Sequence, residues 1–329
     1  MNRRRIAIGV SSVSGLAVIA VSAMNMFSSG GAAGGRGHST VDLHTTPVAA
    51  VTAAGPATDR AGTAQVDSLL TMATPATPAQ GKTPAQPAQT ATMHGTGQYD
   101  FGRQTGKIDL TLANGGLEEV LTPGVLYMRS VPSNAATPAK PWSRVDAAKS
   151  SDGNLVSGGV TDPALEFAML AGVQPGVKFV GQDQVRGVPV AHYQGTLDLK
   201  QAASTPTPAG APAAAPARPA GQALPAAPAA QAVPAADVAA AKKALANAAR
   251  AFTTTKVPFD AYLDEQGRLR RFVAVFSFTM PGPAKAVAQV TSATELFGFG
   301  TPVTVATPTV APAAPTPSAR PSSPSGTHK

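Results

Sequence analysis

The chain of 329 residues carries no cysteine, 31 prolines, 32 glycines and a formal net charge of +8. The missing cysteines exclude disulfides, thiolate metal sites, a cysteine nucleophile and a lipid-modified cysteine. The positive charge does not predict a nucleic-acid partner. Residues 95–200 are nearly neutral, much of the excess charge lies at the N-terminus and in residues 201–255, and only RLRR, Arg268 to Arg271, comes close to a basic surface cluster.

The N-terminal segment has the composition of an export signal. Three arginines precede an uncharged run from Ile6 to Met26, and this order of charged and apolar regions is typical of secretory signals. Small residues predict cleavage after Ala23 in a signal that covers residues 1–27. The same run could instead be an uncleaved anchor with its arginines in the cytoplasm, or a buried helix. The first two interpretations place the rest of the chain outside the cytoplasmic membrane.

Several segments are too rich in small residues and proline to form a core. Residues 28–45 predict a flexible spacer, and residues 75–91 predict a proline-rich loop. Residues 201–235 are mostly alanine and proline, and they bury too little apolar surface to offset the entropy of ordering. We therefore expect a disordered insert there and a disordered tail at 309–329. The sequence between residues 46 and 308 predicts one folded domain.

The first half of this domain predicts one short helix and a run of strands. Residues 46–60 favour a helix that Gly55 and Pro56 would interrupt. Alternating apolar residues between turn residues then predict several strands. The predicted strands cover residues 60–74, 92–101, 106–113, 117–122, 124–130 and 140–146.

The second half predicts two helices and two hairpins. Asp162 is expected to cap a helix over residues 162–170, with Pro163 in its first turn. The other predicted elements are a hairpin over 177–199, a helix over 236–252, a hairpin over 256–280 and a closing segment at 301–308. Because no strand–helix–strand repeat occurs, we expect an α+β fold with a single large antiparallel sheet and a few helices on one face.

The sequence contains no assembled catalytic set. His192 has no second histidine at ligand spacing, so it predicts a structural or surface role. The QGKT sequence lacks the first glycine of a phosphate loop, because position 76 is Ala76. Glu118 and Glu119 are neighbours in a strand, point to opposite faces and are expected to be solvated. We expect no enzyme activity, no metal and no cofactor.

Five segments, in their order along the chain, resemble the actinobacterial LppX/LprG-type lipoproteins, which belong with the LolA/LolB-like lipid carriers. The segments are GVLYMRS with KPWSRVD, DPALEFAMLAGV, VGQDQVRGVPVAHYQGTLDL, KVPFDAYLDEQGRLRRFVAVF and TELFGFGTPVTVATP. The resemblance implies a strongly curved half-barrel with helices on its concave side. It also implies an apolar cavity that shelters acyl chains of lipids or glycolipids. The chain differs from these lipoproteins in lacking the cysteine that they acylate.

The leading hypothesis is an exported lipid-binding or lipid-transfer protein that works at a membrane surface and binds no nucleic acid. A non-enzymatic scaffold of the cell envelope with a filled core is the second hypothesis, and a secreted enzyme is the third. The candidate cavity residues are apolar strand positions, and a register slip of one residue would invert their faces. These residues are Ile108, Leu110, Leu112, Val125, Tyr127, Phe259, Leu263, Val273, Val275 and Phe276.

Overall fold

The computed structural model describes most of the predicted domain. The described residues are 46–79, 81, 84–112, 115–134, 136–158, 162–205, 235–280 and 285–310. The predicted signal and its cleavage site, the spacer, most of the insert and nearly all of the tail lie outside them. Every described residue belongs to one compact unit of the chain, Thr40–Lys329.

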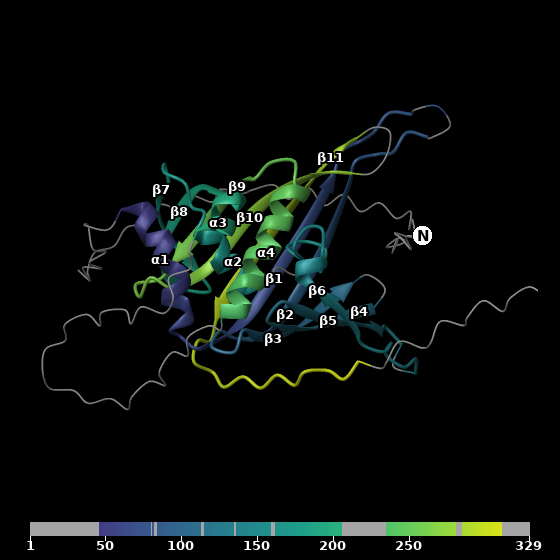
Figure 1. Ribbon diagram of the computed structural model, residues 1–329, viewed down its shortest axis with the longest axis horizontal. Coiled ribbons are helices and arrows are strands. Elements are labelled where there is room, and N and C mark those ends of the chain that lie inside the picture. Colours follow the sequence, from purple (N-terminus) through teal and green to yellow (C-terminus); the bar gives the residue numbers. More distant parts are fainter. Residues whose placement is uncertain are drawn as a thin grey trace, which may run out of the picture. The chain divides into compact units, whose positions relative to one another are not determined.

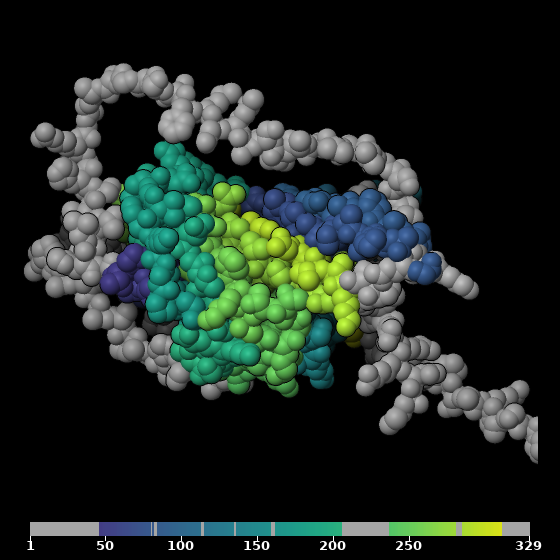
Figure 2. All heavy atoms as spheres, turned by 90° about the horizontal axis from the view of Figure 1, so that it is seen from above, coloured from purple at the N-terminus to yellow at the C-terminus, as the bar shows by residue number. Residues whose placement is uncertain are grey.

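Eleven strands form one open antiparallel sheet in the order β6-β5-β4-β3-β2-β1-β11-β10-β9-β8-β7 (Figure 1). The strands are β1 (Thr63–Thr74), β2 (Gln89–Asp100), β3 (Thr105–Leu112), β4 (Gly115–Thr122), β5 (Val125–Pro132), β6 (Ser143–Asp146), β7 (Lys178–Val185), β8 (Val188–Asp198), β9 (Lys256–Leu263), β10 (Leu269–Thr279) and β11 (Val287–Phe297). The first strand pairs with the last, so β1 and β11 meet inside the sheet. In the space-filling view, the blue β1–β2 segment lies against the yellow-green segment of β10 and β11 (Figure 2).

The helices pack on one side of this sheet. They are α1 (Pro47–Asp59), α2 (Pro163–Leu170), α3 (Leu199–Ser204) and α4 (Ala235–Ala251), with a 3-10 turn η1 (Ala147–Lys149). We call the side that they cover the inner face and the other side the outer face. The curved antiparallel sheet with helices on one face confirms the predicted fold class.

Alternation along the strands sets which residues point inward. In β9, Val257, Phe259 and Ala261 are buried, and their neighbours are more exposed. In β10, Phe272 and Phe276 are buried in the same way. Because side chains alternate between the two faces of a strand, β9 and β10 each have a buried inner row and a more exposed outer row.

Two helices differ from the sequence expectation. Helix α1 runs through Gly55 and Pro56 without interruption. Its N-terminus is capped by Thr46, and Gly55 leaves room for Phe167, which lies 3.3 Å from the position a Cβ would take there. The start of the predicted insert is also ordered, because α3 continues to Ser204 after a cap by Asp198.

The end of the domain also differs from the prediction. The last strand along the chain is β11, which lies between the predicted hairpin at 256–280 and the predicted closing segment at 301–308. Residues 301–308 follow it without regular structure, although Val303 is buried. The cap of α2 is as predicted, since Asp162 accepts a hydrogen bond from the Ala164 backbone N–H at 2.9 Å.

The Thr58 side chain links α1 to the start of β10 by a hydrogen bond. Its hydroxyl donates to the Ala54 carbonyl at 2.7 Å and accepts from the Leu269 N–H at 2.8 Å, and all three residues are buried. Thr58→Val keeps the shape but leaves the Leu269 N–H unpaired, so we expect a loss of about 1–3 kcal/mol in the free energy of unfolding. Urea denaturation measures it.

Thr52→Val is the matched control for this prediction. Thr52 lies on the same helix and donates to Val48 at 2.8 Å, but it is exposed. Its substitution should change the free energy of unfolding by less than about 0.5 kcal/mol. Equal losses in the two variants would show that the bond to Leu269 contributes nothing.

Candidate functional site

The structure separates the predicted cavity residues into two faces. Ile108, Leu110, Phe259, Leu263 and Phe276 lie on the inner face and are buried. Leu112 lies on the same face of β3 as Ile108 and Leu110, but it is 37% exposed. Tyr127, Val273 and Val275 alternate with inner-face residues and point to the outer face, so they cannot line the same cavity as Phe276. Val125 lies at the β4–β5 turn and lines a small pocket.

Beneath the helices, the inner face is filled by the protein's own side chains. Phe259 stacks on Phe272 at 5.8 Å between ring centroids, and Phe252 at the end of α4 stacks on Phe276 at 5.0 Å. Met169 of α2 and Leu245 of α4 are completely buried in the same cluster. This half of the sheet therefore has a packed core.

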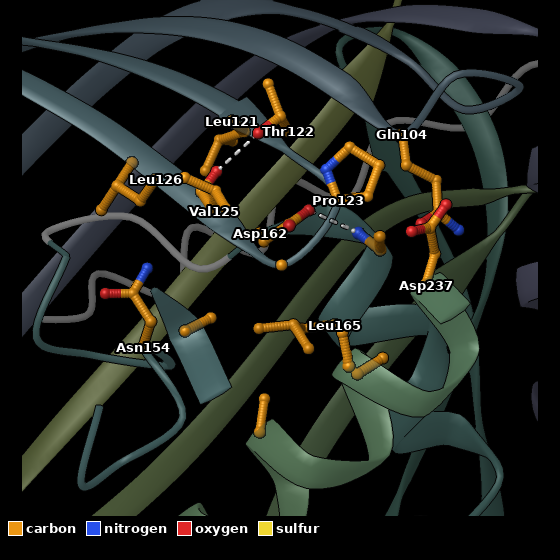
Figure 3. Close-up of a pocket in the computed structure, with 16 residues that line it drawn as sticks. Gln104, Leu121, Thr122, Pro123, Val125, Leu126, Asn154, Asp162, Leu165 and Asp237 are labelled. Carbon is orange, nitrogen blue, oxygen red and sulfur yellow. Dashed lines mark hydrogen bonds between the residues drawn. The ribbon is translucent and has the colours of Figure 1, made fainter. Parts of the chain in front are cut away.

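A pocket lies where the β4–β5 turn meets the first turns of α2 and α4 (Figure 3). Its walls are mostly apolar and include Leu121, Pro123, Leu126, Leu165 and Ala241. Its volume is about 30 Å³, which is room for roughly two water molecules. This pocket is therefore too small to hold the acyl chains that the resemblance implied.

A different part of the inner face is apolar and partly open to solvent. Met93 of β2, Leu117 of β4 and Met128 of β5 are only partly buried, and they pack against the second core cluster. Leu112 of β3 lies in the same register and is 37% exposed. We call these four residues the open apolar strip. An apolar surface of this kind lowers the free energy when it is removed from water.

Glu119 of β4 lies on the inner face beside this strip. It is fully buried, opposite Ile108 of β3 and Met128 of β5. Neither carboxyl oxygen has a hydrogen-bond partner among the described residues. Burial raises the pKa of Glu119 well above its usual value. The expectation that this residue is solvated was wrong. Glu119 is buried because it lies on the same face of β4 as Leu117 and Leu121. Glu118 points to the outer face and forms a salt bridge with Arg129 at 2.6 Å.

Two further acids lie in α2 and its N-cap: Glu166 is buried and Asp162 is partly buried. Glu166 accepts a hydrogen bond from the Thr294 hydroxyl at 2.7 Å, and burial raises the pKa of Glu166 to about 8. Asp162 accepts from the Tyr99 hydroxyl at 2.9 Å, and burial raises the pKa of Asp162 to about 6. Sequence reasoning missed Glu166. The helical spacing from Glu166 to the buried residues Met169 and Leu170 would have indicated it.

The other polar residues singled out in the sequence make structural contacts. His192 bonds Asp260 at 2.7 Å and stacks on Tyr262. Arg268 and Arg270 of the RLRR sequence both bind the buried carboxylate of Asp264. No group of three or more histidines and acids within metal-binding reach occurs in the part of the chain that the structure describes. Within that part, no helix has the length and apolar character to cross a membrane.

The described residues define an α+β protein with one open antiparallel sheet and helices on its inner face. No family model matches the chain, and no curated protein matches it. It is similar in structure to the Mycobacterium tuberculosis lipoprotein LppX, with a TM-score of 0.40 and 10% identity over 79% of this chain and 98% of that one. It is also similar to LprF from Mycobacterium bovis, with a TM-score of 0.35 and 12% identity over 80% of this chain and 96% of that one.

Proposed function

We propose that this chain is an extracytoplasmic, non-enzymatic protein that binds acyl chains of lipids on the open apolar strip. The observation that carries the proposal is the partial exposure of Met93, Leu112, Leu117 and Met128 beside a core that is otherwise closed. The predicted export signal and the sequence resemblance to lipid carriers support the same kind of ligand.

The binding energy would come from removing water. Each acyl methylene that leaves water contributes roughly 0.8 kcal/mol, so a few methylenes against the strip suffice for measurable affinity. Both methionines on the strip are unbranched and adaptable, and such side chains tolerate ligands of different shape. The ligand would be held and released without any bond being made or broken, which fits a carrier that exchanges lipid with a membrane surface.

Titration of a fluorescent fatty-acid analogue into the full chain tests this proposal. Leu117→Ser removes apolar surface from the strip and should weaken binding by about tenfold, the equivalent of nearly two methylenes. Tyr127→Ser is the control, because Tyr127 lies on the outer face. Tyr127→Ser should bind like the wild type.

Extraction of the purified protein followed by lipid mass spectrometry gives an independent test. We expect co-purified lipid from the wild-type protein and less from Leu117→Ser at equal protein. A wild-type protein that shows no saturable probe binding and carries no lipid would overturn the proposal.

A filled scaffold of the cell envelope is the second candidate function. The packing beneath the helices favours it, because Met169, Leu245 and Phe259 are buried in one tightly packed core cluster. A scaffold would bind neither the probe nor lipid, and substitutions on the strip would then alter stability alone.

A further inference from the structure

Glu119 lies at the border between the closed core and the open apolar strip. Along β4 its inner-face neighbours are Leu121, which is 2% exposed, and Leu117, which is partly exposed. Across the sheet it faces Ile108 on one side and Met128 of the strip on the other. An acyl ligand on the strip would therefore bring its end next to the Glu119 carboxyl.

This carboxyl is unusual because it is buried and unpaired. It is 0% exposed, and both of its oxygens lack a hydrogen-bond partner among the residues described. The great majority of buried side-chain polar atoms have a partner, and leaving one without a partner is costly. A strand needs no acid at this position to form, since its other inner-face residues are apolar. A buried acid that the fold leaves unsatisfied suggests a partner that comes from outside the chain.

Among the described residues of β3, β4 and β5, no cation shares the inner face with Glu119. The charged side chains nearest in the register alternate to the outer face; they are Lys107 and Asp109 of β3, Glu118 of β4 and Arg129 of β5. Two other acids belong to the N-cap and first turn of α2, and they are Asp162, which bonds to Tyr99, and Glu166, which bonds to Thr294. The carboxyl therefore rests in apolar surroundings, where its neutral form is favoured.

We propose that Glu119 is a binding residue for an uncharged hydroxyl group carried by the acyl lipid. The inference rests on the proposed lipid-binding function and adds the chemical class of the ligand. A neutral carboxyl presents one O–H donor and one carbonyl acceptor, and a hydroxyl group complements both. A phosphate or an ammonium group would instead bring a charge into apolar surroundings, which is costly. Lipids with free glycerol, sugar or hydroxy-acyl hydroxyls belong to this class.

Competition binding with two alkyl probes tests the inference. In this experiment, 1-decanol and 1-chlorodecane, which have the same chain length, compete separately with a fluorescent fatty-acid analogue for the full chain. Because a hydrogen bond to an otherwise unpaired buried group is worth about one factor of ten in affinity, the wild type should prefer decanol by about tenfold. The Glu119→Leu variant should bind decanol and chlorodecane with about equal affinity. Its affinity for chlorodecane should equal or exceed that of the wild type.

Two variants keep the test decisive. Glu119→Gln retains a donor and an acceptor without an ionisable group, so it should keep most of the preference for decanol. Glu118→Gln changes the neighbouring acid on the outer face and should behave like the wild type. Circular dichroism of each variant checks that the sheet is intact. If Glu119→Leu does not fold, the test rests on Glu119→Gln and on a third competition of the wild type with decylammonium, a cationic probe of the same chain length.

The outcomes separate the two proposals. If neither probe displaces the analogue and the analogue itself does not bind, the lipid-binding function is overturned, and the role of Glu119 with it. If both probes bind the wild type equally well, the lipid-binding function stands and the role of Glu119 is overturned. A wild-type preference for decylammonium over decanol would overturn the hydroxyl class in favour of a cationic ligand.

Discussion

Phe272→Ala is expected to lower the free energy of unfolding by about 3–5 kcal/mol, because it opens a cavity in the packed half of the inner face. Phe272 is 1% exposed and stacks on Phe259 at 5.8 Å. It lies opposite Ala261 of β9 and Thr294 of β11, which are too small to refill the space. Chemical denaturation of the purified variant measures the loss.

The neighbouring Val273→Ala is the matched control. Val273 occupies the next position of β10, on the outer face, and is only partly buried. Its substitution should cost about 1 kcal/mol, because fewer apolar atoms lose contact. If the two variants lost equal stability, the assignment of the faces of β10 would be wrong.

The free energy of unfolding should fall as the pH rises from about 4.5 to about 8. Burial raises the pKa of Glu166 from 4.5 in the unfolded chain to about 8 in the fold, so the folded state holds a proton that the unfolded state has released. The stabilisation is complete below the lower value and is lost as the pH passes the upper one. The slope from this group is up to about 1.4 kcal/mol per pH unit.

Glu166→Gln should flatten this slope, since a glutamine side chain stays neutral and can still accept from the Thr294 hydroxyl. Urea denaturation at several pH values between 5 and 9 measures the change. Glu295→Gln is the control, because Glu295 lies on the outer face of β11 in salt bridges with Arg186 and Arg271, and it should leave the Glu166 contribution in place. A Glu166→Gln protein with the full wild-type slope would contradict this account.

Local sequence patterns predicted the sheet well, because apolar and polar residues alternate along a strand and this alternation is visible in the sequence. The alternation in β9 and the turn at Asp264 to Gly267 identified the last hairpin. The Asp162–Pro163 pair identified the start of α2, because a cap and a first-turn proline act locally. Helix α1 was misjudged at Gly55, because its support comes from Phe167, which is far away in the sequence.

The candidate site was harder to predict than the fold. Which apolar rows a helix covers depends on how distant segments pack, and a single sequence does not record this. Phe276 and Val275 look equally suitable in the sequence, yet one is buried under α4 and the other lies on the outer face. Glu119 was missed because an acid was assumed to be solvated. The apolar residues Leu117 and Leu121, two positions away on either side, lie on the same face of the strand and indicate burial.

The pairing of β1 with β11 also bears on when the protein can fold. Residues near Val66 must find residues near Leu296, and the loop between them includes nearly the whole domain. Closing so long a loop is entropically costly, and folds with such distant contacts form slowly. A nascent chain that lacks its final strand would have two half-sheets with unpaired inner edges, so such a chain would be vulnerable to proteases and aggregation until synthesis is complete.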